Sequence, residues 1–539
     1  MAAPYAHEGA APRRGPLAWM PWLWALVAGL AQAAALAWPV PGGLHGQPLW
    51  WLQILSLALL GRLLLAAGRA RRAALLSWLF ATAWLAGTFW WLFISMHVYG
   101  GLAAPLAVLA VLGLAAFLGS YYAAASACFW ALRPANKALA AIVFAVLWLL
   151  AELARGQWWT GFPWGAGGYA HADGPLAVLA RWIGVYGMGL VAALLAMGLA
   201  QWRRADLRRP RWWIALAALV LAWAGLTAQR HCAIEGCAAP APQHDPLSLA
   251  LLQGNIPQDE KFQPGSGVPM ALQWYHDQLR AADAALVVAP ETAIPLLPQQ
   301  LAPGYLDAIS ERYTQTQGAQ ALLVGIPLGS LEQGYTNSVL GFAPGLARPY
   351  RYDKHHLVPF GEFVPPFFRW FTDLMNIPLG DFDRGPLTQA SLTWAGERIA
   401  PNICYEDLFG EELGARFADP LSAPTIMANL SNIGWFGDTV AIDQHLAISR
   451  LRTLEFERPM LRATNTGATA VIDHRGQVTY RLPSYQRGVL RAQVQGRGGA
   501  ITPYAWWVSR WGLAPLWALG LGVTAAAWLS RRRRQRVCP

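Results

Sequence analysis

A single cysteine ends an apolar stretch of the sequence and has the surroundings of a nucleophile. Cys404 follows the run Ile399–Ile403 and precedes the acidic residues Glu406 and Asp407, which are typical of the first turn of a helix. A thiol at a strand-to-helix corner faces the positive end of the helix dipole, which favours the thiolate. Because the thiolate is the nucleophilic form, this segment is suited to covalent acyl chemistry. A buried cysteine that packs as a small apolar residue is the alternative interpretation.

Two further segments present reactive side chains at the ends of apolar runs. Val287–Pro295 presents Glu291, and Tyr350–Pro365 presents Lys354 and Glu362. A carboxylate can take the proton of a thiol, the thiolate can attack a carbonyl, and an ammonium can stabilise the resulting oxyanion. The three segments therefore suffice for acyl transfer, although Glu291 or Lys354 taken alone could be an ordinary surface residue.

The neighbouring histidines are not expected to bind a metal. His355 and His356 have no other His or Cys near them at metal-ligand spacing, so we interpret both as structural or surface residues. No organic cofactor is indicated either.

The composition places these residues in a membrane protein. The 539 residues are 55% hydrophobic and 13% charged, whereas soluble chains carry about 25% charged residues. A membrane-spanning helix needs about 20 mostly apolar residues. Eight stretches qualify, and they predict eight transmembrane helices: Ala18–Ala37, Leu49–Ala67, Ala74–Ser95, Leu102–Tyr122, Ala138–Leu153, Pro175–Leu199, Trp212–Leu226 and Trp511–Leu529.

The loop charges predict the orientation. Basic residues occupy alternate loops, so both termini are expected in the cytoplasm. Because the net charge of +11 is largely explained by this pattern, nucleic-acid binding is not expected. The first segment is longer than the apolar core of a signal peptide, which favours a retained helix over a cleaved one ending near Ala31–Ala33. The basic groups are Arg13 and Arg14; Arg69, Arg71 and Arg72; Arg133 and Lys137; Arg203, Arg204, Arg208, Arg209 and Arg211; and Arg531–Arg534 with Arg536.

The segment between the seventh and eighth helices predicts a domain outside the cytoplasm. We expect residues 1–229 to hold seven helices, residues 230–505 to form the catalytic domain, and residues 506–539 to hold the eighth helix and a basic tail. Short β-rich runs alternate with helical patterns, which argues for an α/β layered domain. Cys232 and Cys237 are close enough in sequence to pair. The expected strands are Leu247–Gln253, Ala285–Ala289, Ala321–Ile326, Ser338–Phe342, Ile399–Cys404, Thr425–Asn429, Ala468–Ile472 and Val489–Val494, and the expected helices are Met270–Ala282, Tyr305–Gln317, Leu408–Phe417 and Asp443–Arg458.

The order of the three reactive segments resembles the Glu-Lys-Cys set of the nitrilase superfamily. More closely, nearly the whole chain is similar to the membrane-bound apolipoprotein N-acyltransferase family. The residues that carry this resemblance lie in Leu252–Gln258, Pro290–Pro295, Asp353–Pro365, Asn402–Glu406, Asn429–Asp438, Gln444–His445, Arg458–Gly467 and Gly161–Trp164.

The resemblance implies a fold and a set of roles. The domain would be a nitrilase-like four-layer αββα sandwich. Glu291 would be the general base, Cys404 the nucleophile and Lys354 the cation that holds the oxyanion. The backbone N–H of Tyr405 would be the second oxyanion donor, with Glu362 as a supporting carboxylate. Glu406 and Tyr405 match positions that the family needs around the nucleophile.

The resemblance also implies the reaction and its place. A phospholipid, typically phosphatidylethanolamine, would donate its sn-1 acyl chain to Cys404 as a thioester. The N-terminal amine of a diacylglyceryl-cysteine apolipoprotein would then accept it. The location would be the bacterial inner membrane, with the catalytic domain in the periplasm. No metal or cofactor is implied.

Some features leave alternatives open. The family often has Trp where this chain has Phe262, and an Asp-Ala pair where it has Ile433-Gly434, which affects acyl-chain packing more than the chemistry. The apolar run Phe363–Ile377 would form a membrane-facing lid or pack on the domain core. A membrane-tethered amidase or nitrilase would use the same three residues. A transporter would need intramembrane ionisable residues, which these spans largely lack.

Overall fold

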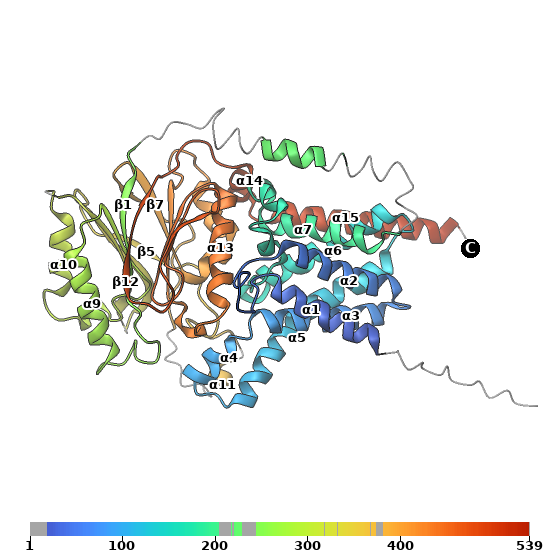
Figure 1. The fold of residues 1–539 in the computed structure, drawn as a ribbon, viewed down its shortest axis with the longest axis horizontal. Coiled ribbons are helices and arrows are strands. Elements are labelled where there is room, and N and C mark those ends of the chain that lie inside the picture. Colours follow the sequence, from blue (N-terminus) through green and yellow to red (C-terminus); the bar gives the residue numbers. More distant parts are fainter. Residues whose placement is uncertain are drawn as a thin grey trace, which may run out of the picture.

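The chain folds into a helical bundle and a layered domain of two sheets, which lie at opposite ends of an elongated molecule (Figure 1). The computed structural model describes residues 19–203, 217, 220–228, 244–316, 318–330, 332–366, 368–372 and 381–537. Cys232 and Cys237, whose pairing the sequence leaves open, and most of the predicted seventh span lie outside the described residues.

The bundle is built from long apolar helices. Among the described residues, three helices are long and apolar enough to cross a membrane, and bent helix pairs raise this number to five. Two more apolar helices, α1 and α2, are shorter. The bundle helices are α1 (Met20–Ala34), α2 (Trp50–Ala66), α3 (Ala70–Thr88), α4 (Leu92–Ile94), α5 (Ala104–Leu132), α6 (Lys137–Gln157), α7 (Ala180–Ala200), α14 (Pro503–Trp511) and α15 (Ala514–Val537).

One predicted span is interrupted in the structure, and another begins after a sharp bend. The third was expected to be continuous over Ala74–Ser95, but α3 ends at Thr88 and the chain turns by 63° into α4 and the π-helical turn η1 (Ser95–Tyr99). The eighth was expected from Trp511, but α14 and α15 meet there at 85°. Gly512 has a φ of +53° at this corner, a conformation that glycine adopts without strain. The count of eight spans stays a prediction.

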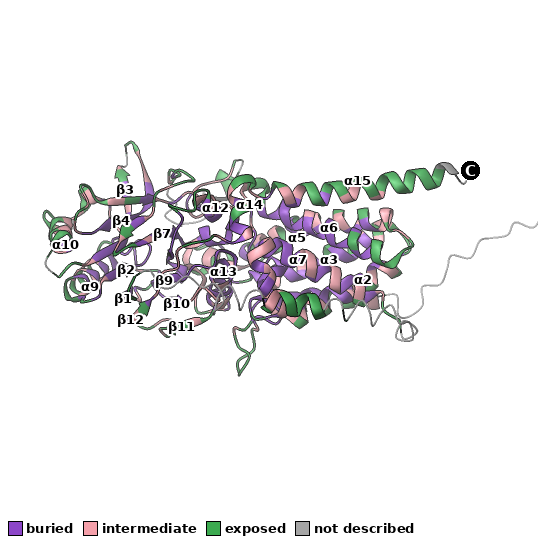
Figure 2. Cartoon of the chain, turned by 90° about the horizontal axis from the view of Figure 1, so that it is seen from above, coloured by how far each residue is buried: buried purple, intermediate pink, exposed green. Residues whose placement is uncertain are grey.

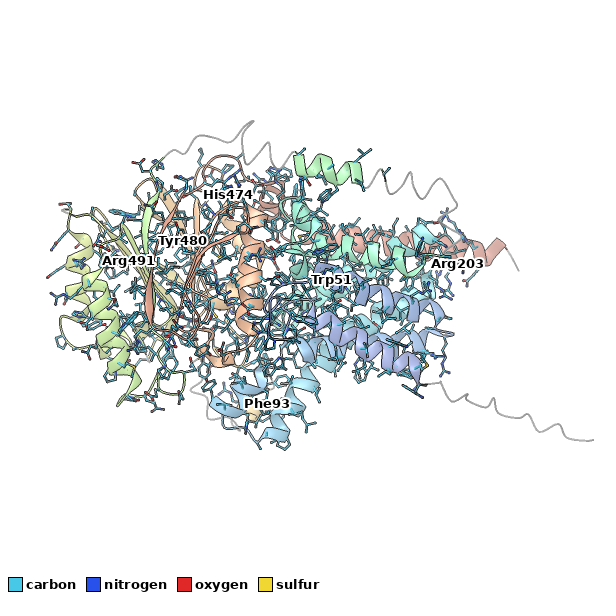
Figure 3. The ribbon with its side chains drawn as sticks, viewed as in Figure 1. Trp51, Phe93, Arg203, His474, Tyr480 and Arg491 are labelled. Atoms are coloured by element: carbon cyan, nitrogen blue, oxygen red, sulfur yellow. The ribbon has the colours of Figure 1, made fainter. Side chains whose placement is uncertain are left out.

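The basic residues of the loops predicted to be cytoplasmic gather at the end of the bundle away from the sheets. They follow the C-terminal ends of α2, α5 and α7 or begin α3 and α6, and Arg203 marks this end in Figure 3, while Trp51 lies near the junction. Purple interiors and green outer faces show that the apolar helices bury one side and leave the other exposed (Figure 2). The basic residues of this end that the structure describes are Arg69, Arg71, Arg72, Arg133, Lys137, Arg203 and Arg531–Arg534.

The layered domain contains two six-stranded mixed sheets with the same pattern of strand directions. The strand orders are β12-β1-β2-β3-β4-β5 and β6-β7-β8-β9-β10-β11. In each sheet three neighbouring strands are parallel, and the flanking strands are antiparallel. The first sheet has β1 (Leu247–Gln253), β2 (Leu286–Ala289), β3 (Ala321–Ser330), β4 (Gly334–Phe342), β5 (Tyr350–Asp353) and β12 (Gly488–Val494); the second has β6 (Leu392–Trp394), β7 (Glu397–Ile403), β8 (Ile426–Ser431), β9 (Met460–Thr464), β10 (Ala470–Ile472) and β11 (Val478–Arg481).

Helices cover the outer face of each sheet. The helices α9 (Gly267–Ala281) and α10 (Tyr305–Thr314) share a buried apolar core with β1, β2 and β3. A second core, containing Leu251, Val288, Ile403 and Leu430, fills the space between the sheets. On the far side lies α13 (Ala441–Phe456), so the domain has the four layers expected from the resemblance.

All eight predicted strands are present, but four others were missed. The missed strands are β5, β6, β9 and β11, which have only three to five residues each. The predicted helix Leu408–Phe417 is instead a short α12 (Gly410–Gly414) between 3-10 turns.

The helix α13 joins the layered domain to the bundle. Gln444 is buried on α13, and its Oε1 accepts hydrogen bonds from the indoles of Trp164 at 2.8 Å and Trp91 at 3.2 Å. Its Nε2 donates to the Thr88 carbonyl oxygen at 3.0 Å. At the other end of the junction, Arg181 pairs with Glu457 at 2.8 Å. One glutamine therefore satisfies three buried polar groups of the bundle.

Replacing Gln444 should weaken the junction. In Gln444→Leu the two indole N–H groups and the Thr88 carbonyl lose their partner, at a cost of about 1–3 kcal/mol for each group left unpaired. We expect the midpoint of thermal unfolding in detergent to fall by several degrees. Gln493→Ala, on the exposed side of β12, is the matched control and should not move it. An unchanged midpoint for Gln444→Leu would show that these bonds do not hold the junction.

Candidate functional site

The candidate residues follow the ends of three strands. Glu291 lies in the turn after β2, Lys354 directly follows β5, and Cys404 directly follows β7. Thr292 and Cys404 have φ values of +48° and +51°, in a left-handed region that non-glycine residues rarely adopt. Such strain persists only where the surrounding structure holds it. The two turns are therefore held in position by the packed sheets behind them.

Lys354 lies between two carboxylates. Its Nζ is 2.8 Å from Oε1 of Glu362 and 3.5 Å from Oε1 of Glu291, and its side chain is 1% exposed. Asn337, on β4, donates from Nδ2 to both carboxylates at 2.7 Å. The second oxygen of Glu291 accepts from the backbone N–H of Asn432 at 2.8 Å. The structure thus brings Glu291, Lys354 and Glu362 into one hydrogen-bonded cluster.

Burial and charge set the protonation of this cluster. Burial alone would lower the pKa of Lys354, but Glu362 and Glu291 outweigh it, and the pKa is raised. The protonated, cationic form of Lys354 is therefore favoured. Cys404 is close enough to Glu291 and Lys354 for both to act on it electrostatically. Burial, reinforced by Glu291, raises the pKa of Cys404 to about 12, and Lys354 opposes this rise.

The expected effect of a helix dipole on Cys404 is wrong. Cys404–Leu408 is a five-residue 3-10 turn rather than the start of a long helix. One such turn has too few aligned peptides to stabilise a thiolate, and burial of the thiol dominates instead. The resting residue is a neutral thiol, so an adjacent base has to take its proton. Glu291 is one of the carboxylates that act electrostatically on this thiol.

Glu406 and Tyr405 hold the turn that carries Cys404. The carboxylate of Glu406 accepts from the backbone N–H of Ile403 at 2.6 Å and from that of His355 at 2.7 Å. It also accepts from the Tyr352 hydroxyl at 2.8 Å. Glu406 therefore joins the Cys404 turn to the Lys354 segment. Tyr405 donates from its hydroxyl to the Gly161 carbonyl at 3.1 Å, which joins the same turn to the bundle.

A buried ion cluster behind Cys404 was missed by the sequence analysis. Asp407 accepts from His445 Nε2 at 2.9 Å and from Arg462 at 3.2 Å. Burial raises the pKa of Asp407, but His445 and Arg462 outweigh it, and the pKa is lowered. Asn429 and His445 also contact the Cys404 carbonyl oxygen. Motifs containing these residues were noted, but their separation in sequence concealed that they meet.

The two adjacent histidines have structural contacts, as expected. His356 stacks on Phe409 with ring centroids 3.5 Å apart, and its Nε2 donates to the Thr160 carbonyl at 3.1 Å. Burial lowers the pKa of His356 to about 3, so the ring is neutral. No group of three or more His, Cys, Asp or Glu side chains placed to hold a metal occurs in the described part of the chain.

The apolar run Phe363–Ile377, expected either to form a lid or to pack on the domain core, is only partly described by the structure. Of Phe363–Ile377, residue 367 and residues 373–377 lie outside the described residues. Phe368 is 44% and Trp370 is 63% exposed on the part around α11 (Arg369–Thr372). Phe262 is likewise partly exposed, at 38%. These apolar side chains do not pack into a core cluster of the layered domain.

Family comparisons agree with this architecture. Residues 248–501 match the carbon-nitrogen hydrolase family, so the layered domain is of the nitrilase type. Residues 33–198 match the N-terminal domain of apolipoprotein N-acyltransferase. A curated apolipoprotein N-acyltransferase of Verminephrobacter eiseniae is 67% identical over 92% of this chain and 94% of its own length, and one of Ralstonia nicotianae is 47% identical over 90% of each. The chain therefore belongs to the apolipoprotein N-acyltransferase family, whose members are acyltransferases.

The solved structures give a more distant likeness. A carbon-nitrogen hydrolase from Helicobacter pylori G27 is 15% identical, with a TM-score of 0.35, over 46% of this chain and 89% of that chain.

A glycine behind Glu291 should be sensitive to substitution. A Cβ at Gly325, on β3, would lie 2.4 Å from the Pro290 carbonyl oxygen and 2.7 Å from the Glu291 Cα. Gly325→Ala therefore has to displace the Glu291 turn. Because a displacement of about 1 Å costs on the order of a hundredfold in rate, we expect the acyltransferase rate to fall at least tenfold.

The control for Gly325→Ala is Gly488→Ala on β12. There a Cβ would meet only Leu482 side-chain atoms at 3.8 Å or more. Its rate and thermal midpoint should match those of the wild type. If Gly325→Ala retained the full rate, the position of the Glu291 turn would not limit the reaction.

Proposed function

We propose that the protein transfers an acyl chain from a phospholipid, through a thioester on Cys404, to the N-terminal amine of a diacylglyceryl-cysteine apolipoprotein. The observation that carries this proposal is the cluster of Glu291, Lys354 and Cys404, joined through Tyr405 to a membrane bundle. Phosphatidylethanolamine is the proposed donor, and its sn-1 chain is the one transferred.

The first step forms the thioester. Glu291 takes the proton of Cys404, and the thiolate attacks the ester carbonyl of the phospholipid. The ammonium of Lys354 and the backbone N–H of Tyr405 stabilise the oxyanion of the tetrahedral intermediate. The carbon–oxygen ester bond then breaks, and Glu291 returns its proton to the departing lysophospholipid. Glu362 keeps Lys354 charged and in place throughout.

The second step releases the acyl chain to the amine. The acceptor nitrogen attacks the thioester, and Glu291 takes one of its protons. The carbon–sulfur bond breaks, an amide forms, and the proton on Glu291 returns to the Cys404 sulfur. Water would give hydrolysis by the same route. The names of the close relatives favour the amine acceptor over the amidase alternative.

The placement of charges supports a location at the outer face of the bacterial inner membrane. The arginines described above lie at the end of the bundle opposite the layered domain, as the positive-inside rule requires for cytoplasmic loops. We propose that this end is cytoplasmic, with both termini, and that the layered domain is periplasmic. Eight spans, and the division at residues 229 and 505, complete the proposed topology. Exposed tryptophans near the junction, including Trp158, Trp159 and Trp506, suit the interface between membrane and water.

The central test is covalent labelling. Purified protein incubated with acyl-labelled phosphatidylethanolamine should acquire label through a bond that hydroxylamine cleaves. Cys404→Ala should acquire none, because it has no sulfur to acylate. Wild-type protein that never labels, but hydrolyses a simple amide, would replace the transferase with a hydrolase.

The role of the base has its own test. Glu291→Gln keeps the shape of the side chain but cannot accept the thiol proton. We expect thioester formation to slow by about 10²- to 10⁴-fold, with an intact fold. Glu311→Gln, on the exposed side of α10, is the control. Acylation of Glu291→Gln at the wild-type rate would remove Glu291 from this role.

A further inference from the structure

Lysine is rare in this chain, and two of its three lysines lie in the layered domain close to Glu291. The sequence has 41 basic residues, but only Lys137, Lys261 and Lys354 are lysines. Lys137 begins a bundle helix at the end far from the sheets. The other two are the only lysines of residues 230–505, and both side chains are buried to 1% exposure. Where charge alone is needed this chain uses arginine, so a second buried ammonium near Glu291 calls for an explanation.

Lys261 reaches the site from the turn that follows β1. Its Nζ donates to the main-chain carbonyl oxygen of Glu291 at 3.1 Å. This carbonyl belongs to the turn in which Thr292 has a positive φ. The backbone N–H of Lys261 donates to the Pro257 carbonyl at 2.9 Å, which fixes the lysine's own turn. A compact ammonium on a long stem thus anchors the strained segment that carries the base.

The hydrogen-bonding capacity of Lys261 is not used up. An ammonium has three donors, and in the described part of the chain the Glu291 carbonyl is its one hydrogen-bond acceptor. A buried charge is costly unless negative groups compensate it. The ionisable groups that act on Lys261 are Glu291, after β2, and Cys404, after β7. Burial lowers the pKa of Lys261 to about 7, and these two groups oppose the fall.

The charges of the site balance only if Lys261 is counted. With a neutral thiol, Glu291 and Glu362 face Lys354 and Lys261. When the S–H bond of Cys404 breaks and its proton moves to Glu291, the negative charge moves from the carboxylate to the sulfur. The total is unchanged, and neither lysine gives up a proton. Without Lys261, the new thiolate would develop in a site with an uncompensated negative charge.

We propose that Lys261 is a positioning residue for acyl transfer: it holds the Glu291 carbonyl and compensates the charge that Cys404 acquires. This inference rests on the proposed function, because it assigns a role within the same thioester-forming step. A purely structural lysine would only hold the turn, and its charge would be irrelevant to the rate.

The scarcity of lysine makes a direct measurement practical. Full-length protein grown with ε-¹³C-lysine should give three lysine signals, assigned with Lys137→Arg and Lys261→Met. The Lys261 signal should titrate near pH 7, whereas an ordinary lysine titrates near about 10.4. In Glu291→Gln the titration should move to lower pH, because Glu291 holds the Lys261 pKa up. A Lys261 signal that does not change between pH 5.5 and 9 would overturn the proposal.

The kinetic measurement is single-turnover labelling of Cys404 by phosphatidylethanolamine. We expect Lys261→Met to slow labelling at least tenfold at pH 6.5 relative to the control Lys137→Met, at a temperature at which both variants are folded. The wild-type rate should fall above pH 7 as Lys261 loses its proton, and Lys261→Met should lack this fall. If the wild-type protein is labelled and the rate for Lys261→Met is within twofold of the wild-type rate, the role of Lys261 is wrong but the proposed function stands. If wild type does not label, the proposed function fails.

Discussion

A lysine ammonium that is buried away from water needs negatively charged partners. At Lys354 this requirement fixes the positions of the segments that supply them. The pair of carboxylates around it comes from the turn after β2 and from the segment after β5, and Asn337 on β4 binds both. Removing one member would leave a buried charge unpaired, which costs far more than the pair itself contributes. The cluster thus links three strands of the first sheet close to the Cys404 thiol, which follows a strand of the second sheet.

In the second sheet, a different group of charged side chains holds the turn that carries Cys404. Asp407, His445 and Arg462 link the Cys404 turn to α13 and β9. Because α13 packs on the sheet with one side and on the bundle with the other, it is common to both parts of the molecule. The distance of the nucleophile from the bundle is consequently set by side-chain packing and the Gln444 and Tyr405 contacts, rather than by the length of a tether.

The reactive residues and the layered fold could be predicted because they lie in long, ordered motifs and in apolar runs. The short strands β5, β9 and β11 carry Arg351, Arg462 and Arg481, and such charges mask a strand pattern. The helix-dipole argument for Cys404 was wrong because sequence showed acidic residues but not the length of the helix. Lys261 was overlooked because burial of a single lysine beside two acidic residues has no signature in sequence. Only the three-dimensional structure places the turn after β1 against Glu291.

The pairing of β1 with β12 has a consequence for synthesis. These are the first and last strands of the domain, and all seven residues of β1 pair with β12, from Leu247 with Val494 to Gln253 with Gly488. Until residue 494 has left the ribosome, β1 remains an open edge, and open edges invite pairing with other chains. Non-local pairings of this kind also fold slowly. A nascent chain therefore exposes this edge during nearly the whole synthesis of the domain, and the first sheet is complete only once its last strand has been made.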